Sequence, residues 1–527
     1  MNNLKKYAKN NVWVVLLCAL TLNGAVAREA STAPAQRNLA ATRNFYAQLI
    51  SGTTPNVAEL TLFTTMLPKG GDLHHHYSGA IYAETYLDWV GAQGYCVYRV
   101  TDPVLKIEKF RIETNPQGQS ETARQLCSSA DQVRADNAFY RGLLKTWSDK
   151  DFDNHTHEQP APDQQFFDTF GYFGAVSDYD YNKGLQSLKE RAKAENLGYL
   201  ETMLKGGPTM PRPDLDKQLN ALAGISFTTT SSSSSSRQVD EVLAHAFDVL
   251  SHDADTAALI DDYVKSLQAA VAGLDDDDFK LRFQAYANRN SSPAKVFGAL
   301  YGAFAAAQRS QLLVGVNIVA PENGYVSMRD YDLHMKMFAF LKQRFPGVKL
   351  SLHAGELALG MVPPEGLRSH IRDAVLTAGA DRIGHGVDIV HEADAPELLR
   401  QMKRRPVAVE INLSSNAFIL GIKNEAHPLR LYTRFGVPIV ISTDDAGVSR
   451  NNLSGEYLLF VSRYKPDYDE LKRVVYNSIR YSFLPDEEKR SEMAKLDKRF
   501  AEFESRIADL PVCRASTCQS LGNARAR

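Results

Sequence analysis

The chain has 527 residues, of which 44% are hydrophobic and 23% are charged, and this is an ordinary globular composition. A formal net charge of -2 gives no reason to expect a nucleic-acid partner or an anionic membrane surface. The length suits one large domain with insertions, or two domains.

The first 27 residues have the pattern of a secretory signal peptide. Lys5, Lys6 and Lys9 precede an apolar run from Val12 to Leu22. Ala25-Val26-Ala27 then gives the small-x-small pattern of a signal-peptidase cleavage site. The apolar run is too short to span a bilayer comfortably. We therefore expect cleavage after residue 27, a periplasmic or secreted protein, and no stable membrane anchor in the mature chain.

Four cysteines remain after that cleavage, and an even number in an oxidising compartment permits disulfides. Of the three connectivities, we expect the one that pairs neighbours in the sequence, Cys96 with Cys127 and Cys513 with Cys518. These cysteines show no C-x-x-C spacing, so a thiolate zinc site is not expected.

Flanking segments are expected on both sides of the main domain, which we place at residues 68–505. Residues 28–67 are predicted to form an N-terminal helical extension that ends at Pro68, and residues 506–527 a C-terminal tail. The stretch from about 83 to 162 is polar and aromatic and contains prolines and two cysteines. We predict that it is an insertion after the first strand rather than part of the core.

Eight short apolar segments alternate with segments of helical periodicity, and this alternation predicts an α/β fold, a (β/α)8 barrel of the TIM type. An open doubly wound sheet is the alternative, which is disfavoured because no glycine-rich fingerprint follows a first strand. The expected strands are Asp72–His76, Gly198–Met203, Phe279–Ala285, Leu312–Ile318, Lys349–His353, Arg382–His385, Val407–Ile411 and Pro438–Thr443. Expected helices include Ala294–Gln308, Tyr331–Arg344, Gly366–Thr377 and Ala395–Arg404.

Two histidines end the first expected strand. His74 and His76 are two residues apart on an extended segment, so both imidazoles point to one face and His75 points to the other. Such a pair can begin a metal site, but the spacing alone leaves that interpretation open. His155 and His157 have the same spacing in a polar loop with no strand to orient them, and we expect a surface loop there.

The motif His353-Ala354-Gly355-Glu356 follows the fifth expected strand. His353 can add a third nitrogen ligand. Glu356 lies past a glycine that allows a sharp turn, so its carboxyl can reach over the metal without binding it. If burial raises its pKa, this carboxyl can donate a proton. Taken alone, the motif favours a structural interpretation, a strand-end histidine and a glutamate that caps the next helix.

Two further motifs follow the sixth and eighth strands. Glycines flank His385 and leave its imidazole at the barrel mouth, although a buried structural histidine fits this tripeptide too. Asp444 and Asp445 follow a very apolar strand, where paired carboxylates are costly unless a cation lies between them. Helix capping is the alternative for that pair. Together, these groups at strand ends are what hydrolytic zinc chemistry requires.

These motifs resemble those of adenosine deaminases. The stretch MLPKGGDLHHHYSGA (residues 66–80) is similar to the opening motif of that family, and SLHAGE, DRIGHG and STDD follow in the family's order. LGYLETM and LVGVNIVAPE resemble its second and fourth strands, and FFDTFGYF resembles an aromatic segment before strand two. The resemblance covers roughly residues 66–480. Export and the insertion are also similar to the secreted, growth-factor-related branch.

The resemblance implies one zinc ion per subunit. The implied ligands are His74, His76, His353 and Asp444. It also implies that Glu356 donates a proton to N1 of a purine while hydroxide attacks C6. His385 would orient or deprotonate the water, and Asp445 would hold N7 and the hydroxide. The implied substrate contacts are Asp445, Ser78, Gly79 and the backbone near Ala320.

Two positions depart from the family's pattern. Tyr77 and Ser78 occupy the stretch where the family usually has an aspartate for the ribose 5′-hydroxyl, and Ala320 followed by Pro321 replaces a usual glycine. Both concern nucleoside recognition. We expect a deaminase of adenosine or 2′-deoxyadenosine, with a small-molecule nucleoside as partner. Another 6-aminopurine or modified nucleoside, a secreted signalling or binding protein with a relic barrel, and a homodimer all stay open.

Overall fold

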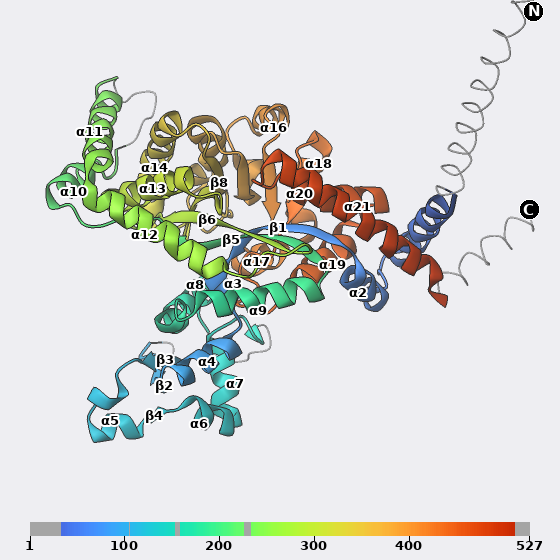
Figure 1. The fold of residues 1–527 in the computed structure, drawn as a ribbon, viewed down its shortest axis with the longest axis horizontal. Helices are drawn as coiled ribbons and strands as arrows, with labels where there is room; N and C mark the ends of the chain where they lie inside the picture. The colour runs from blue at the N-terminus through green and yellow to red at the C-terminus, as the bar shows by residue number, and fades with distance from the viewer. Residues whose placement is uncertain (1–32, 105, 153–158, 226–232, 512–527) are drawn as a thin grey trace, which may run out of the picture.

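The computed structural model describes residues 33–511 except 105, 153–158 and 226–232 (Figure 1). The predicted signal peptide, Cys513 and Cys518 lie outside the described residues, as do His155 and His157. Within the described ranges, no helix is both long and apolar enough to cross a membrane.

Eight parallel strands form the centre of the molecule, in the order β1-β5-β6-β7-β8-β9-β10-β11 (Figure 1). Their bounds are β1 Lys69–His76, β5 Leu197–Gly206, β6 Lys280–Asn288, β7 Leu313–Val319, β8 Lys349–Ala354, β9 Arg382–His385, β10 Ala408–Ile411 and β11 Ile439–Ile441. A parallel bridge between His75 and Asp444 joins β1 to the end of β11. Each predicted strand overlaps an observed one, and the predicted α/β barrel is confirmed.

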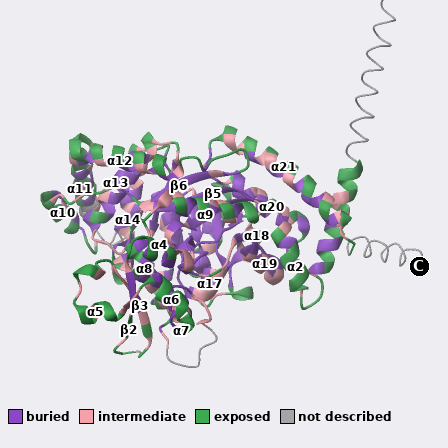
Figure 2. Cartoon of the chain, turned by 60° about the horizontal axis from the view of Figure 1, so that its bottom comes forward, coloured by how far each residue is buried: buried purple, intermediate pink, exposed green. Residues whose placement is uncertain are grey.

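Helices cover the outside of the barrel, which explains why strands such as β9 and β10 are buried on both faces. Those between β1 and β8 include α8 Pro162–Phe173, α9 Tyr181–Ala194, α10 Pro213–Asn220, α11 Ser233–His252, α12 Ala254–Val271, α13 Pro293–Arg309 and α14 Tyr325–Arg344. Those after β8 are α15 His370–Asp373, α16 Ala395–Arg404, α17 Leu413–Ile419, α18 Leu429–Phe435, α19 Leu453–Tyr464, α20 Tyr468–Arg480 and α21 Asp486–Asp509. Figure 2 shows buried residues concentrated on the strands and exposed ones on outer helices such as α10.

The predicted helix Gly366–Thr377 is wrong as a continuous α-helix. The segment consists of a 3₁₀ turn at Pro364–Leu367, the four-residue α15 and a π-helical turn at Ala374–Ala378. The Glu392 carboxylate accepts the backbone N–H groups of Ile371 (2.6 Å) and Arg372 (3.2 Å), so a new helix N-terminus begins there. The other predicted helices are present, and α14 begins earlier than predicted, at Tyr325.

The N-terminal extension consists of a helix over residues 33–49 and of α2, Val57–Met66, with a break between them. The first helix contacts α20 and α21, since Arg43 pairs with Asp469 (2.7 Å) and Thr42 Oγ1 donates to the Glu504 carbonyl (3.4 Å). Helix α21 continues to Asp509, past the predicted boundary at residue 505.

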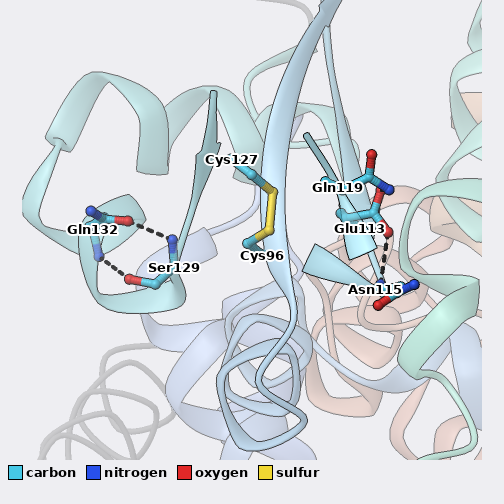
Figure 3. The surroundings of a disulfide bond; sticks show 7 residues. All are labelled: Cys96, Glu113, Asn115, Gln119, Cys127, Ser129 and Gln132. Atoms are coloured by element: carbon cyan, nitrogen blue, oxygen red, sulfur yellow. Dashed lines mark hydrogen bonds between the residues drawn. A yellow bond between two sulfur atoms is a disulfide. The ribbon is translucent and has the colours of Figure 1, made fainter. Parts of the chain in front are cut away.

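The insertion after β1 is a lobe with its own three-stranded antiparallel sheet, below the barrel in Figure 1. It contains α4 Ala83–Ala92, β2 Cys96–Thr101, β3 Glu108–Glu113, α5 Glu121–Gln125, β4 Cys127–Ser128, α6 Ala130–Ala135 and α7 Asn137–Thr146. A disulfide joins Cys96 to Cys127 (Figure 3), which confirms the first predicted pair. We call residues 83–147 the insertion lobe.

Candidate metal centre and active site

Four side chains converge at the C-terminal mouth of the barrel: His74, His76, His353 and Asp444. Their ligand atoms all lie within 4.8 Å of one another. Asp444 Oδ1 is 3.3 Å from Nε2 of both His74 and His76. The Nε2 atom of His74 is buried without a hydrogen-bond partner among the described residues. Three imidazoles and a carboxylate with such an orphaned nitrogen fit a zinc ion.

Hydrogen bonds orient two of these imidazoles from behind. His74 Nδ1 lies 2.7 Å from Glu410 Oε2, and His353 Nδ1 lies 2.9 Å from Asn317 Oδ1. An oxygen acceptor at Nδ1 keeps the proton there and turns the Nε2 lone pair toward the cluster. Neither partner was predicted from the sequence. Glu410 carries a signal that could have been used, because it is a charged residue in the apolar strand β10.

A buried network of ion pairs and hydrogen bonds holds the Glu410 carboxylate in place behind His74. Arg382 Nη2 donates to Glu201 Oε1 (2.6 Å), Arg382 Nε donates to Glu410 Oε1, and Ser351 Oγ donates to the same Glu410 oxygen (2.8 Å). Burial raises the pKa of the Glu410 carboxyl, but the charge of Arg382 and the bond to His74 outweigh it and bring the pKa to about 2. The carboxylate behind His74 is therefore ionised.

The carboxyl of Glu356 lies beside the cluster, with Oε1 3.7 Å from His385 Nε2. Burial raises the pKa of Glu356 well above its ordinary value, and the charge of Asp444 adds to this. Such a carboxyl keeps its proton near neutral pH and can donate it. The Glu322 carboxylate fixes the turn, because it accepts the backbone N–H groups of Gly355 (3.1 Å) and Glu356 (2.9 Å).

His385 and Asp445 face the same space as Glu356. His385 Nε2 is 3.9 Å from Asp444 Oδ2, and Asp445 Oδ1 is buried without a hydrogen-bond partner among the described residues. Burial raises the pKa of Asp445 well above its ordinary value, as does the charge of Asp444. These two side chains and the Glu356 carboxyl can therefore bind the oxygen and nitrogen atoms of a substrate in this space.

A cavity of about 370 Å³ adjoins the cluster. Its lining includes the metal-cluster residues His76, His353 and Asp444, with Glu356, His385 and Asp445, and on the other walls Ser78, Phe166, Phe167, Phe170, Tyr286, Asn288, Val319, Ala320 and Pro321. Ser78 and Ala320, two of the predicted substrate contacts, thus line this cavity. A cavity of about 400 Å³ between β3, α7 and α8 is slightly larger, but its lining contains none of the cluster's residues.

Gly79 and His75 lie outside that lining. Gly79 packs against Asp445, where a Cβ atom would lie only 1.5 Å from Asp445 Oδ1, so a side chain there would displace the aspartate. His75 points away from the cluster, as the strand period predicted, and its Nδ1 lies 2.9 Å from Thr202 Oγ1.

Part of the chain matches known proteins. A family model described as adenosine deaminase matches residues 246–499. The adenosine deaminase of Enterococcus faecalis is 32% identical over 154 residues, which cover 29% of this chain and 42% of that protein. That of Shewanella denitrificans is 28% identical over 221 residues, 42% of this chain and 61% of that protein. The chain thus spans about half the length of the relatives it matches.

Solved structures share the fold. An adenine deaminase from Arthrobacter aurescens superposes with a TM-score of 0.50 at 15% identity, over 82% of this chain and 98% of that chain. An N6-mAMP deaminase from Arabidopsis gives 0.50 at 17% identity, over 83% and 99%. Residues 246–499 of this chain therefore match the adenosine deaminase family model, and curated adenosine deaminases are similar to this chain over part of their length.

Proposed function

We propose that this chain is a zinc-dependent hydrolase that deaminates a purine, with adenosine or 2′-deoxyadenosine as the preferred substrate. One observation carries the proposal: the four candidate metal ligands converge next to a buried carboxyl, Glu356, which lines the cavity together with His385, 3.7 Å away. Zn²⁺ held there by the three histidines and Asp444 would supply a Lewis acid that activates water at neutral pH.

Each of the side chains around the cluster has a separate role in the proposed reaction. Glu356 donates its proton to N1 of the purine ring, which makes C6 more electrophilic as the water oxygen attacks it. His385 and Asp445 bind that oxygen and hold it on one face of C6. One proton of the water passes to the exocyclic nitrogen, and the other returns to the Glu356 carboxylate. The C6–N bond of the tetrahedral adduct breaks, ammonia leaves, and C6 keeps the oxygen as the carbonyl of inosine or 2′-deoxyinosine while N1 keeps its proton.

The cavity favours an uncharged nucleoside over a nucleotide. None of the described residues that line it is lysine or arginine, so a phosphate would enter without a counter-charge. Three phenylalanines of α8, Phe166, Phe167 and Phe170, offer apolar rings to a flat base and its sugar. Ser78 in place of an acidic residue supports the second candidate, a 6-aminopurine or modified nucleoside other than adenosine.

The test is a substrate panel on the zinc-loaded protein. Loss of the ultraviolet absorbance band of adenosine and 2′-deoxyadenosine is expected, with slower turnover of adenine, N6-methyladenosine and AMP. Chelation should abolish turnover, and added zinc should restore it. Absence of turnover of every 6-aminopurine by folded, metal-loaded protein would refute the proposal, and faster turnover of another member of the panel would favour the second candidate.

The relic-barrel alternative has its own test. A biological effect that persists in Glu356→Ala, after that variant has lost deaminase activity, would assign the effect to signalling rather than to catalysis. We also propose that the chain is exported. N-terminal sequencing of the mature protein should then begin at residue 28, and an intact N-terminus in the cytoplasm would contradict export.

A further inference from the structure

A row of buried hydrogen bonds runs from the start of α18 to His385. The backbone N–H of Leu429 donates to His427 Nδ1 (3.2 Å). His427 Nε2 lies 3.1 Å from Asn416 Oδ1, and Asn416 Nδ2 lies 2.9 Å from His385 Nδ1. Asn412 Nδ2 is a second amide nitrogen near that same His385 atom, at 3.4 Å. Neither Asn416 nor His427 lines the substrate cavity.

The backbone donor fixes the direction of every bond in this row. A backbone N–H can only donate, so His427 Nδ1 accepts and the single proton of a neutral His427 lies on Nε2. Burial lowers the pKa of His427 to about 4, so the ring is neutral near pH 7. Its Nε2–H therefore donates to Asn416 Oδ1. Flipping the Asn416 amide would bring two donors together, so the Nδ2 group of Asn416 donates to His385 Nδ1.

We infer that Asn416 and His427 are positioning residues that hold the proton of neutral His385 on Nε2, so that His385 presents a hydrogen-bond donor to the cavity. With Nδ1 occupied as an acceptor, a neutral imidazole has its N–H at the other nitrogen. That nitrogen is the one 3.7 Å from Glu356 Oε1 and 3.9 Å from Asp444 Oδ2.

The consequence for catalysis rests on the proposed function. The family resemblance leaves two roles for His385, orienting the water or deprotonating it. An Nε2–H can donate to the attacking oxygen and stabilise the negative charge that develops on it, but this nitrogen cannot accept a proton from that oxygen. His385 then orients and stabilises the oxygen, and the base lies elsewhere in the cavity.

The direct test measures the protonation state of the two ring nitrogens of His385 by ¹⁵N NMR, in zinc-loaded protein with labelled histidine. The His385 signals are identified by their loss in His385→Gln. The expected spectrum shows a protonated Nε2 and an unprotonated Nδ1. A protonated Nδ1 with an unprotonated Nε2 would overturn the inference. This measurement needs no substrate, so lack of activity would refute the proposed function and leave the inference standing.

Asn416→Asp tests the row itself, because it replaces the donor with a carboxylate that only accepts. Nδ1 of His385 should become protonated, and kcat should fall on the order of 10²- to 10⁴-fold with little change in KM. Asn424→Asp is the matched control, since it adds the same charge to an exposed position between α17 and α18. It should change neither readout. An unprotonated Nδ1 in folded Asn416→Asp would contradict the inference.

Discussion

Three non-glycine residues of the site have left-handed backbone: His385 (φ 67°), Asp444 (φ 59°) and Ala320 (φ 84°). Such conformations cost about 1–3 kcal/mol each and persist only where surrounding contacts enforce them. For Asp444 those contacts are known, because its N–H donates to the His74 carbonyl (2.8 Å) and its carbonyl accepts from the His76 N–H (3.1 Å). The bridge that closes the barrel therefore also orients a candidate metal ligand.

Ala320 allows a test of this strain. Glycine at that position adopts φ 84° without the Cβ clash, although it adds freedom to the unfolded chain. We expect Ala320→Gly to raise the free energy of unfolding by about 0.5–1 kcal/mol, as measured by urea denaturation. Ala223→Gly, at an exposed position, is the control and should not stabilise the protein. A destabilised Ala320→Gly would show that the position carries no net strain.

Glu356→Gln removes the candidate acidic proton and keeps the shape of the side chain. We expect kcat/KM for the best substrate to fall about 10²- to 10⁴-fold. The melting temperature should not fall, because burial already favours the neutral form of this carboxyl. Glu365→Gln changes an exposed glutamate in the same strand-to-helix loop and should keep full activity. Equal activity of Glu356→Gln and the parent enzyme would remove Glu356 from the mechanism.

The barrel strands could be predicted because short, mostly apolar segments of strand length, such as Val407–Ile411, alternate with segments of helical periodicity. Partners across the barrel could not, because pairing Glu410 with His74 requires knowledge of which strands meet in space. The same limit applies to α15, whose start depends on the Glu392 carboxylate, about twenty residues away in the chain. Local patterns thus predict elements and candidate ligands, whereas supporting contacts need the fold.

Glu322 follows β7 and links it to β8 and α15. Its carboxylate accepts two backbone N–H groups of the β8 turn, lies 2.6 Å from His370 Nδ1, and faces Arg289 Nη1 at 3.4 Å. Burial raises the pKa of Glu322, but the charge of Arg289 and the bond to His370 outweigh it and bring the pKa to about 2. Folding therefore favours the ionised form of this carboxyl.

This shift predicts a pH-dependent effect of Glu322→Gln. Against an ordinary pKa of 4.5, a folded pKa of about 2 corresponds to about 3 kcal/mol of stability, which is present above pH 4.5 and is lost as the pH falls toward 2. Urea denaturation should show the variant about 3 kcal/mol less stable at pH 6, with the gap closing toward pH 2. A gap that stays constant between pH 6 and pH 3 would contradict the assigned ionisation.

At the scale of the whole molecule, the insertion lobe is joined to the barrel next to the substrate cavity. Helix α8, which supplies the three phenylalanines of the cavity, also contacts the lobe: the Arg111 guanidinium of β3 lies 5.7 Å from the Tyr172 ring centre. The lobe's sheet was not predicted, because the strands of the β2–β3 hairpin contain many polar residues and β4 is a two-residue strand that pairs with β2 from about thirty residues away. Its disulfide instead followed from the cysteine count and the expected compartment.

Removal of the disulfide tests whether the stability of the insertion lobe affects catalysis in the barrel. It connects residues 31 apart, so its loss should reduce the lobe's stability by about 3–4 kcal/mol through the added freedom of the unfolded chain. In the double variant Cys96→Ala/Cys127→Ala, limited proteolysis should cut faster within residues 83–147 while kcat stays unchanged, since neither cysteine lines the cavity. Reduced parent protein is the matched control and should be cut at the same sites. If kcat fell as well, the structure of the lobe would affect the substrate cavity through α8.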